Sequence, residues 1–126
     1  KYPENGRKEE CNNLITKLRV KLEQKYYQIS KQYYFLDDYK AAIVSFENIL
    51  KEYPDTRYRE EIMYLIVKAN YIYAVKSADN KKRERFKSTV DSYNKFVSYF
   101  PDNGKYNKEA EGWSFSATKE LENLQK

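Results

Sequence analysis

The sequence predicts an all-α protein built as a short solenoid of stacked helical hairpins. A block of sequence recurs: residues 39–62 (YKAAIVSFENILKEYPDTRYREEI) align with residues 86–110 (FKSTVDSYNKFVSYFPDNGKYNKEA), and periodic blocks of this kind are typical of helical repeats. Only three glycines and three prolines occur, too few for the turns of a β-sandwich or barrel. At 126 residues the chain has the length of one domain, so we expect a single domain over residues 1–126.

Residues 26–54 carry the apolar pattern of one such hairpin. Bulky and small residues recur at helical spacing on two stripes, and a proline closes the unit. The pattern resembles a tetratricopeptide repeat (TPR), with Tyr in place of Trp and Ser in place of Gly. We therefore predict that the repeats and their core are defined by Tyr26, Ile29, Ser30, Tyr33, Ala42, Phe46, Ile49, Pro54, Val90, Tyr93, Phe96 and Pro101.

The first predicted helix covers residues 6–36 and is unusually long. Leucines and other apolar residues recur along it every three, four or seven positions. Residues 7–36 contain neither Gly nor Pro. Cys11 lies on the same apolar pattern, so we expect it to be a small buried side chain. A second helix is predicted over residues 38–53, because Asp37 and Asp38 favour a turn and an N-cap, and Pro54 follows its end.

Three further helices follow. Apolar residues at helical spacing predict the third over residues 57–77, and its match to the repeat pattern is degenerate. A turn at residues 78–80 precedes the fourth, over residues 81–100, and the fifth covers residues 106–124. Together they predict two and a half stacked hairpins.

Composition argues against catalysis. The chain has no His, which removes the commonest general base, Ser-His-Asp triads and most zinc sites. It has one Cys without a His partner and no phosphate-binding glycine motif. Its paired acids fall at predicted helix starts, where they complement the helix dipole. We predict no enzyme activity, no cofactor and no metal, and no segment long enough to span a bilayer.

One local cluster of charge is anomalous. Five of the seven residues 81–87 are basic, at the start of a predicted helix, where each positive charge opposes the dipole by about 0.3–1 kcal/mol. The candidate partner-binding patch is therefore Lys81, Lys82, Arg83, Arg85 and Lys87. An acidic protein surface or anionic headgroups fit it, and a solvated, frayed loop is the alternative. We do not expect nucleic acid, which needs a broader basic face with exposed aromatics.

The repeats also resemble a particular family. The segment FLDDYKAAIVSFENILKEYPDT, a second unit ending in YFPDN and the long first helix are similar to the C-terminal repeats of the BamD family. These are periplasmic lipoproteins of the outer-membrane β-barrel assembly machinery. Repeats of the family typically close with a Tyr-Pro-Asp-Ser/Thr join, which residues 53–56 match, and its long helix ends in a polar turn, as at residues 37–39.

The resemblance implies a function. The protein would be a non-catalytic scaffold on the periplasmic face of the outer membrane, binding the periplasmic domains of the barrel-forming subunit and nascent outer-membrane proteins. It also implies a lipid anchor upstream of these residues, so we expect the chain to be a piece of a longer protein. Two alternatives remain open: a glycan-binding module of a carbohydrate-uptake lipoprotein, with sugars stacked on Tyr and Trp113, and a generic TPR adaptor.

Overall fold

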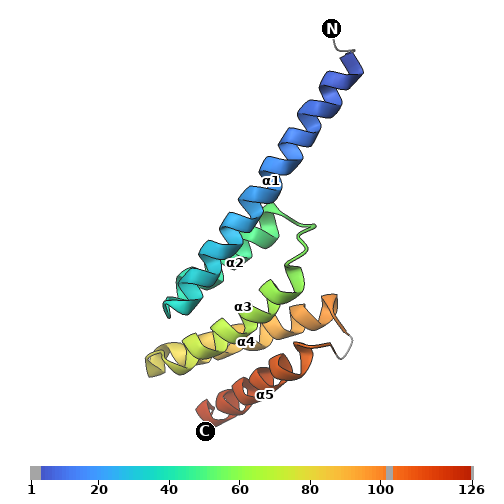
Figure 1. Cartoon of the computed structure of the whole chain (residues 1–126). Helices are drawn as coiled ribbons and strands as arrows, with labels where there is room; N and C mark the ends of the chain where they lie inside the picture. The colour runs from blue at the N-terminus through green and yellow to red at the C-terminus, as the bar shows by residue number, and fades with distance from the viewer. Residues whose placement is uncertain (1–3, 102–103, 126) are drawn as a thin grey trace.

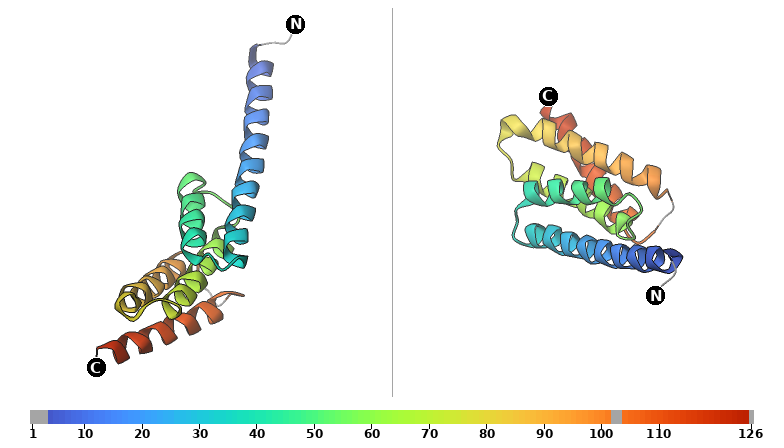
Figure 2. Two further views of the ribbon diagram at one scale, coloured as in Figure 1. Left: turned by 90° about the vertical axis from the view of Figure 1, so that its left-hand side faces the viewer. Right: turned by 90° about the horizontal axis from the view of Figure 1, so that it is seen from above.

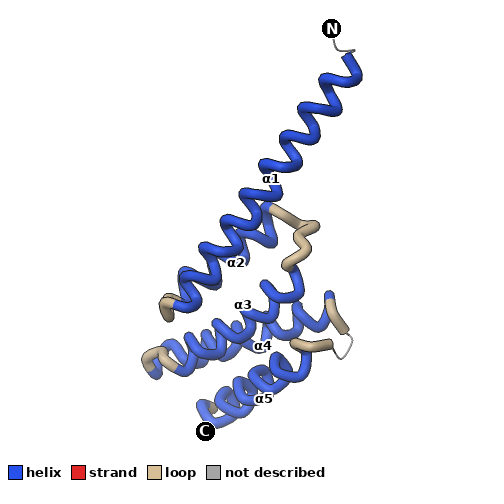
Figure 3. The backbone as a smooth tube through the Cα atoms, in the orientation of Figure 1, coloured by secondary structure: helices blue, strands red, loops and turns tan. Residues whose placement is uncertain are grey.

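A computed structural model of the chain describes residues 4–101 and 104–125, and within them it is all-helical without strands. Five helices follow one another: α1 (Glu4–Phe35), α2 (Tyr39–Glu52), α3 (Arg59–Val75), α4 (Asp79–Tyr99) and α5 (Asn107–Leu124) (Figures 1 and 3). The predicted all-helical fold is confirmed, and each predicted helix is present with ends that differ by at most two residues.

The connection between α1 and α2 shows the predicted turn chemistry. Asp37 takes a left-handed backbone conformation with φ 63°, which short polar side chains tolerate better than most. The Asp38 carboxylate accepts a hydrogen bond from the Ala41 backbone N–H at 3.2 Å and so caps α2. The chain therefore reverses within three residues, and α1 and α2 form a hairpin.

Helix α3 lies at the centre of the stack. It packs against α2 on one side, α4 on another and α5 on a third (Figure 2). Residues 62–67 are consequently all buried, and Ile62 and Val67 are fully so. A helix that is apolar all round is expected only where neighbours surround it.

The predicted core is largely confirmed on α2 and α4. Ala42, Phe46, Ile49 and Phe96 are at most 2% exposed, while Val90 and Tyr93 are partly buried. Pro54 and Pro101 are exposed and follow the ends of α2 and α4, as expected of residues that stop a helix.

The small residues predicted at the α1–α2 crossing behave as expected. Ser30 is fully buried, its hydroxyl donates to the Tyr26 carbonyl at 2.9 Å, and it also bonds the Ser45 hydroxyl on α2. Ile29 beside it is partly buried. A small side chain here lets the two backbones approach closely.

The prediction that Tyr26 and Tyr33 are core residues is wrong. They are 46% and 39% exposed, whereas the adjacent Tyr27 is 5% exposed and stacks on the Tyr58 ring at 4.2 Å. Tyr34 is likewise packed against the core. The buried side of α1 is therefore rotated toward Tyr27 and Tyr34, while Ser30 belongs to both the predicted and the observed side.

The prediction that Cys11 is buried is also wrong, because its side chain is exposed. Leu14 and Leu18 in the same half of α1 are 56% and 61% exposed, and Leu22 just beyond it is 45% exposed. This half of α1 extends well past the end of α2, where no other described element covers it (Figures 1 and 2).

Across the described ranges, none of the helices combines the length and apolar character needed to cross a membrane.

Candidate partner-binding groove

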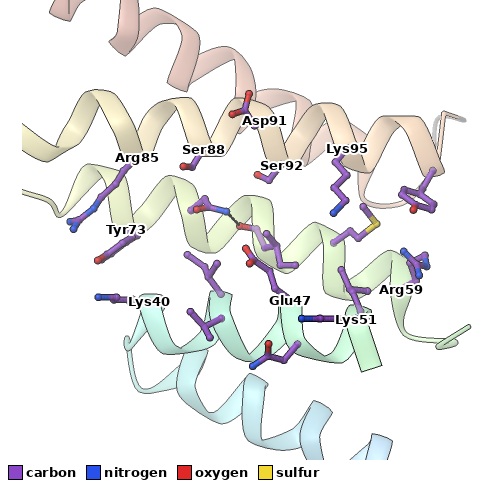
Figure 4. A pocket seen from close by; sticks show the side chains of 18 of the residues that line it. Lys40, Glu47, Lys51, Arg59, Tyr73, Arg85, Ser88, Asp91, Ser92 and Lys95 are labelled. Atoms are coloured by element: carbon purple, nitrogen blue, oxygen red, sulfur yellow. Dashed lines mark hydrogen bonds between the residues drawn. The ribbon is translucent and has the colours of Figure 1, made fainter. Parts of the chain in front are cut away.

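An open groove runs between α2 and α4, with α3 as its floor (Figure 4). Both walls pack on α3, and the space between them has a volume of about 1130 Å³. Each helix presents one stripe to it. On α4 the lining residues recur at the spacing of one helix face, and they are Lys81, Glu84, Arg85, Ser88, Asp91, Ser92, Lys95 and Tyr99.

One end of the groove is built around Arg85. Its guanidinium lies 4.1 Å from the centre of the Tyr73 ring on α3 and donates a hydrogen bond to the Ser77 hydroxyl at 2.5 Å. Lys40 lies at the same end (Figure 4). Lys81, one helical turn before Arg85 on α4, also lines the groove. The aromatic face and the serine hold Arg85 in place. Glu84 lines the groove beside it, so this end carries three basic residues and one acidic residue.

The opposite end repeats the arrangement with other residues. The Arg59 guanidinium lies 4.7 Å from the centre of the Tyr99 ring and donates to the Pro54 carbonyl at 2.5 Å. Lys51 and Lys95 complete this end. The groove thus has an arginine stacked on a tyrosine at each end, with two lysines beside each pair.

The middle of the groove is polar and less basic. The Asn70 amide donates to the Ile66 carbonyl at 2.9 Å within α3. Glu47, Ser88 and Ser92 line the middle of the groove (Figure 4). Six basic residues line the groove against the three acidic residues Glu47, Glu84 and Asp91. Within the described residues, none of the groove's lysines or acids is in an ion pair, so its charges are open to a partner.

The structure divides the predicted basic patch among different surroundings. Lys81 and Arg85 line the groove, whereas Lys82 pairs with Asp79 at 3.8 Å and Arg83 donates to the Leu124 carbonyl at 3.1 Å. Lys87 is exposed and does not line the groove. Consecutive residues point around a helix rather than to one side, so the five do not form one surface.

Sequence reasoning missed most of the groove. The missed basic and aromatic residues are Lys40, Lys51, Arg59, Tyr73, Lys95 and Tyr99. A signal existed in α4, where basic, small polar and aromatic residues recur at three- and four-residue spacing from Lys81 to Tyr99. The contributions of α2 and α3 depend on how three helices are placed, which no spacing within one helix reveals.

Tyrosines outside the groove, on α1, α2 and α3, have raised pKa values. Burial, reinforced by its hydrogen bond to the Glu109 carboxylate at 2.5 Å, raises the pKa of Tyr64, and burial raises the pKa of Tyr27. At the α1–α2 turn, desolvation and a hydrogen bond to Asp37 raise the pKa of Tyr39 to about 12. These phenols stay neutral at physiological pH, so none is poised as a base or nucleophile.

Trp113 belongs to the same aromatic cluster. Its ring lies 5.4 Å from the Tyr64 ring, and the Lys68 ammonium is 5.5 Å from it. The indole is partly buried and packs against the core. The part of the chain that the structure describes also contains no cluster of three or more His, Cys, Asp or Glu residues able to hold a metal ion.

No family model matches the chain, and no curated protein matches it. Its function must therefore be inferred from the groove itself.

Proposed function

We propose that this protein is a non-catalytic helical-repeat scaffold that binds an extended, acidic segment of a partner protein in the groove between α2 and α4. The observation that carries the proposal is the groove's pattern of charge: basic clusters at both ends, each organised by an Arg–Tyr pair, around a polar middle. Stacked hairpins commonly use such extended surfaces to bind other proteins.

The dimensions of the groove define the segment. Lys81 and Lys95 lie on the same face of α4, and the 14 positions between them correspond to about 21 Å at about 1.5 Å per residue. An extended chain covers that length with about six residues at about 3.3 Å each. The proposed ligand is therefore a segment of about that length with carboxylates at both ends, which meet Lys81 and Arg85 at one end and Arg59 and Lys95 at the other.

The resemblance to the BamD family supports a finer proposal. The resemblance rests on two features, the Tyr-Pro-Asp-Thr join at residues 53–56 and the long first helix. On this basis we propose that the partners are the periplasmic domains of a barrel-forming subunit and nascent outer-membrane proteins. The scaffold would then sit at the periplasmic face of the outer membrane, held by a lipid anchor upstream of these residues.

A peptide titration tests the groove. Fluorescein-labelled hexapeptides with Glu at both ends, at one end or at neither end would be titrated with the 126-residue chain and followed by anisotropy. We expect the doubly acidic peptide to bind most tightly. Lys81→Glu and Lys95→Glu should each weaken its binding by about tenfold, since each removes an attractive charge and adds a repulsive one.

Lys87→Glu is the matched control, because it makes the same charge change on α4 outside the groove. The Lys81 change leaves folding intact, since an acidic residue near the start of a helix complements its dipole. Equal loss of affinity in all three variants would show that the loss comes from the change in net charge, and it would contradict the groove proposal. Capture of a barrel-forming subunit's periplasmic domains by the wild type, but not by Lys81→Glu, tests the finer proposal separately.

A further inference from the structure

Helix α1 presents an uncovered apolar face, which we call the α1 stripe. It recurs every three or four positions, with Ile15 at its edge, and consists of Leu14, Ile15, Leu18, Leu22, Tyr26 and Tyr33. These side chains are between 39% and 61% exposed. Large apolar side chains gathered on one helix face are typical of an interaction site, whereas single exposed ones are ordinary.

The second half of the stripe runs into a groove between α1 and α2. Leu22, Tyr26, Ile29 and Tyr33 line it from α1, and Val44 is among the residues that face them from α2. The groove has a volume of about 990 Å³. From Leu14 to Tyr33 the stripe is about 28 Å long at about 1.5 Å per residue, the length of a helix of about five turns.

A ladder of lysines borders the stripe. Lys17, Lys21 and Lys25 follow one another at four-residue intervals, all are exposed, and none is in an ion pair within the described residues. They lie on the edge of the stripe away from α2. The opposite edge is marked by Arg19, which donates to the Glu52 carbonyl at 2.7 Å, and by Glu23, which binds the Thr56 hydroxyl.

We propose that the α1 stripe binds an amphipathic helix of another protein, with an apolar ridge that packs on the stripe and carboxylates that pair with the lysine ladder. The stripe is long and straight, and it leads into a groove between two helices. Such a surface fits a third helix, whose apolar residues at three- and four-residue spacing would contact it. Unpaired lysines along one flank select acidic residues on the partner, as flanking charges do in coiled coils. This surface is distinct from the groove between α2 and α4.

Two other occupants fit less well. A second copy in antiparallel register centred on Leu18 would lay the lysine ladder of one chain along that of the other, which sets like charges against each other. A flat membrane surface would reach Leu14 and Leu18 but would not follow the stripe into the groove that holds Tyr26 and Tyr33.

The probe is a designed peptide about three heptads long, with Leu at the two core positions of each heptad and Glu at the flanking positions. At neutral pH the glutamates of the free peptide repel one another, which disfavours its helix and its self-association. Binding is followed by fluorescence anisotropy and by the helical circular-dichroism signal that the peptide gains. We expect Leu18→Asp to weaken binding by more than about tenfold, because the docked helix would bury a carboxylate. Phe115→Asp on α5 is the matched control: both side chains are 61% exposed, and its binding should equal that of the wild type.

Charge exchange gives the sharper test. Replacing Lys17, Lys21 and Lys25 together by Glu should abolish binding of the Glu peptide and create binding of the same peptide with Lys at the flanking positions. The control triple variant, Lys87, Lys108 and Lys119 to Glu, carries the same net charge and should keep the wild-type preference. Loss of the preference in both triple variants would overturn the proposal.

The competing occupants are measured in parallel. Sedimentation equilibrium of the chain alone should show a monomer, and vesicles of phosphatidylcholine with phosphatidylglycerol should not retain it. A dimer or vesicle binding that Leu18→Asp abolishes would overturn the proposal in favour of self-association or of a lipid surface. Unchanged peptide binding by Lys81→Glu and Lys95→Glu would separate this site from the groove of the proposed function.

Discussion

Helix α3 and the first half of α1 have the same kind of apolar sequence pattern but differ in burial. Both have apolar residues at helical spacing, yet Ile62 and Val67 are fully buried whereas Leu18 is 61% exposed. Three neighbouring helices surround α3, and the described chain leaves the first half of α1 uncovered. Apolar periodicity thus shows that a helix has an apolar face without showing whether its own chain covers that face.

The difference has an energetic consequence. Burying a large apolar side chain stabilises a fold by about 1.5–3 kcal/mol, so the central helix carries much of the free energy of folding. The exposed leucines of α1 contribute little of it. Local opening should therefore be easiest in the first half of α1 and should require global unfolding in α3.

The largest effect should come from the core that surrounds α3. Phe46 is fully buried on α2, so Phe46→Ala should lower the free energy of unfolding by about 3–5 kcal/mol, measured by urea denaturation. A loss of that size is a large part of the stability of a small domain. A change below about 1 kcal/mol would mean that this position is not part of the core, and the contrast with α1 would fail.

Alkaline pH should act mainly on the buried tyrosines. The pKa values of Tyr27 and Tyr64 are raised in the folded state above their ordinary value of 10.0, so the unfolded chain releases these protons first. The stability that they provide is complete below about pH 10 and falls as the pH rises further, by at most about 1.4 kcal/mol per pH unit for each tyrosine.

Urea midpoints measured between pH 8 and 11 check this dependence. Tyr64→Phe should show a shallower decline, because it removes one of the titrating groups. An identical decline in wild type and variant would show that Tyr64, although it lies in the central helix, does not titrate with unfolding.

The smallest effect should come from α1. Leu18→Ala should change the free energy of unfolding by less than about 0.5 kcal/mol, since the side chain is already largely in water. Hydrogen exchange of the backbone amides gives a second measure, with exchange around Leu18 faster than around Val67 by at least about a hundredfold. A large loss of stability in Leu18→Ala would mean that the stripe is covered in solution.

The sequence predicts the helices well because they depend on local signals. The repeated segment, the acidic turn at Asp37 and Asp38, and the prolines after α2 and α4 each mark a helix end within the chain itself. Ile49 and Phe96 hold equivalent positions of the repeated segment, and both are buried as predicted.

The rotation of α1 could not be predicted in the same way. Tyrosine doublets occur at residues 26–27 and 33–34, seven positions apart, so either member of each doublet fits the helical period. Which member is buried depends on where Tyr58 lies to stack on Tyr27, a contact between helices. The groove between α2 and α4 was missed for the same reason, because its charges come from three separate helices.

The length of α1 also gives the molecule a mechanical property. It has 32 residues against 14 in α2, or about 48 Å against about 21 Å at about 1.5 Å per residue, so roughly 27 Å project beyond the hairpin. A helix without an internal proline bends little, so the projecting part of α1 would move as a rigid arm about its contact with α2. A rotation of about 10° at the contact with α2 would move the N-terminal end of α1 by about 5 Å, and a load on that end would apply torque to the whole stack.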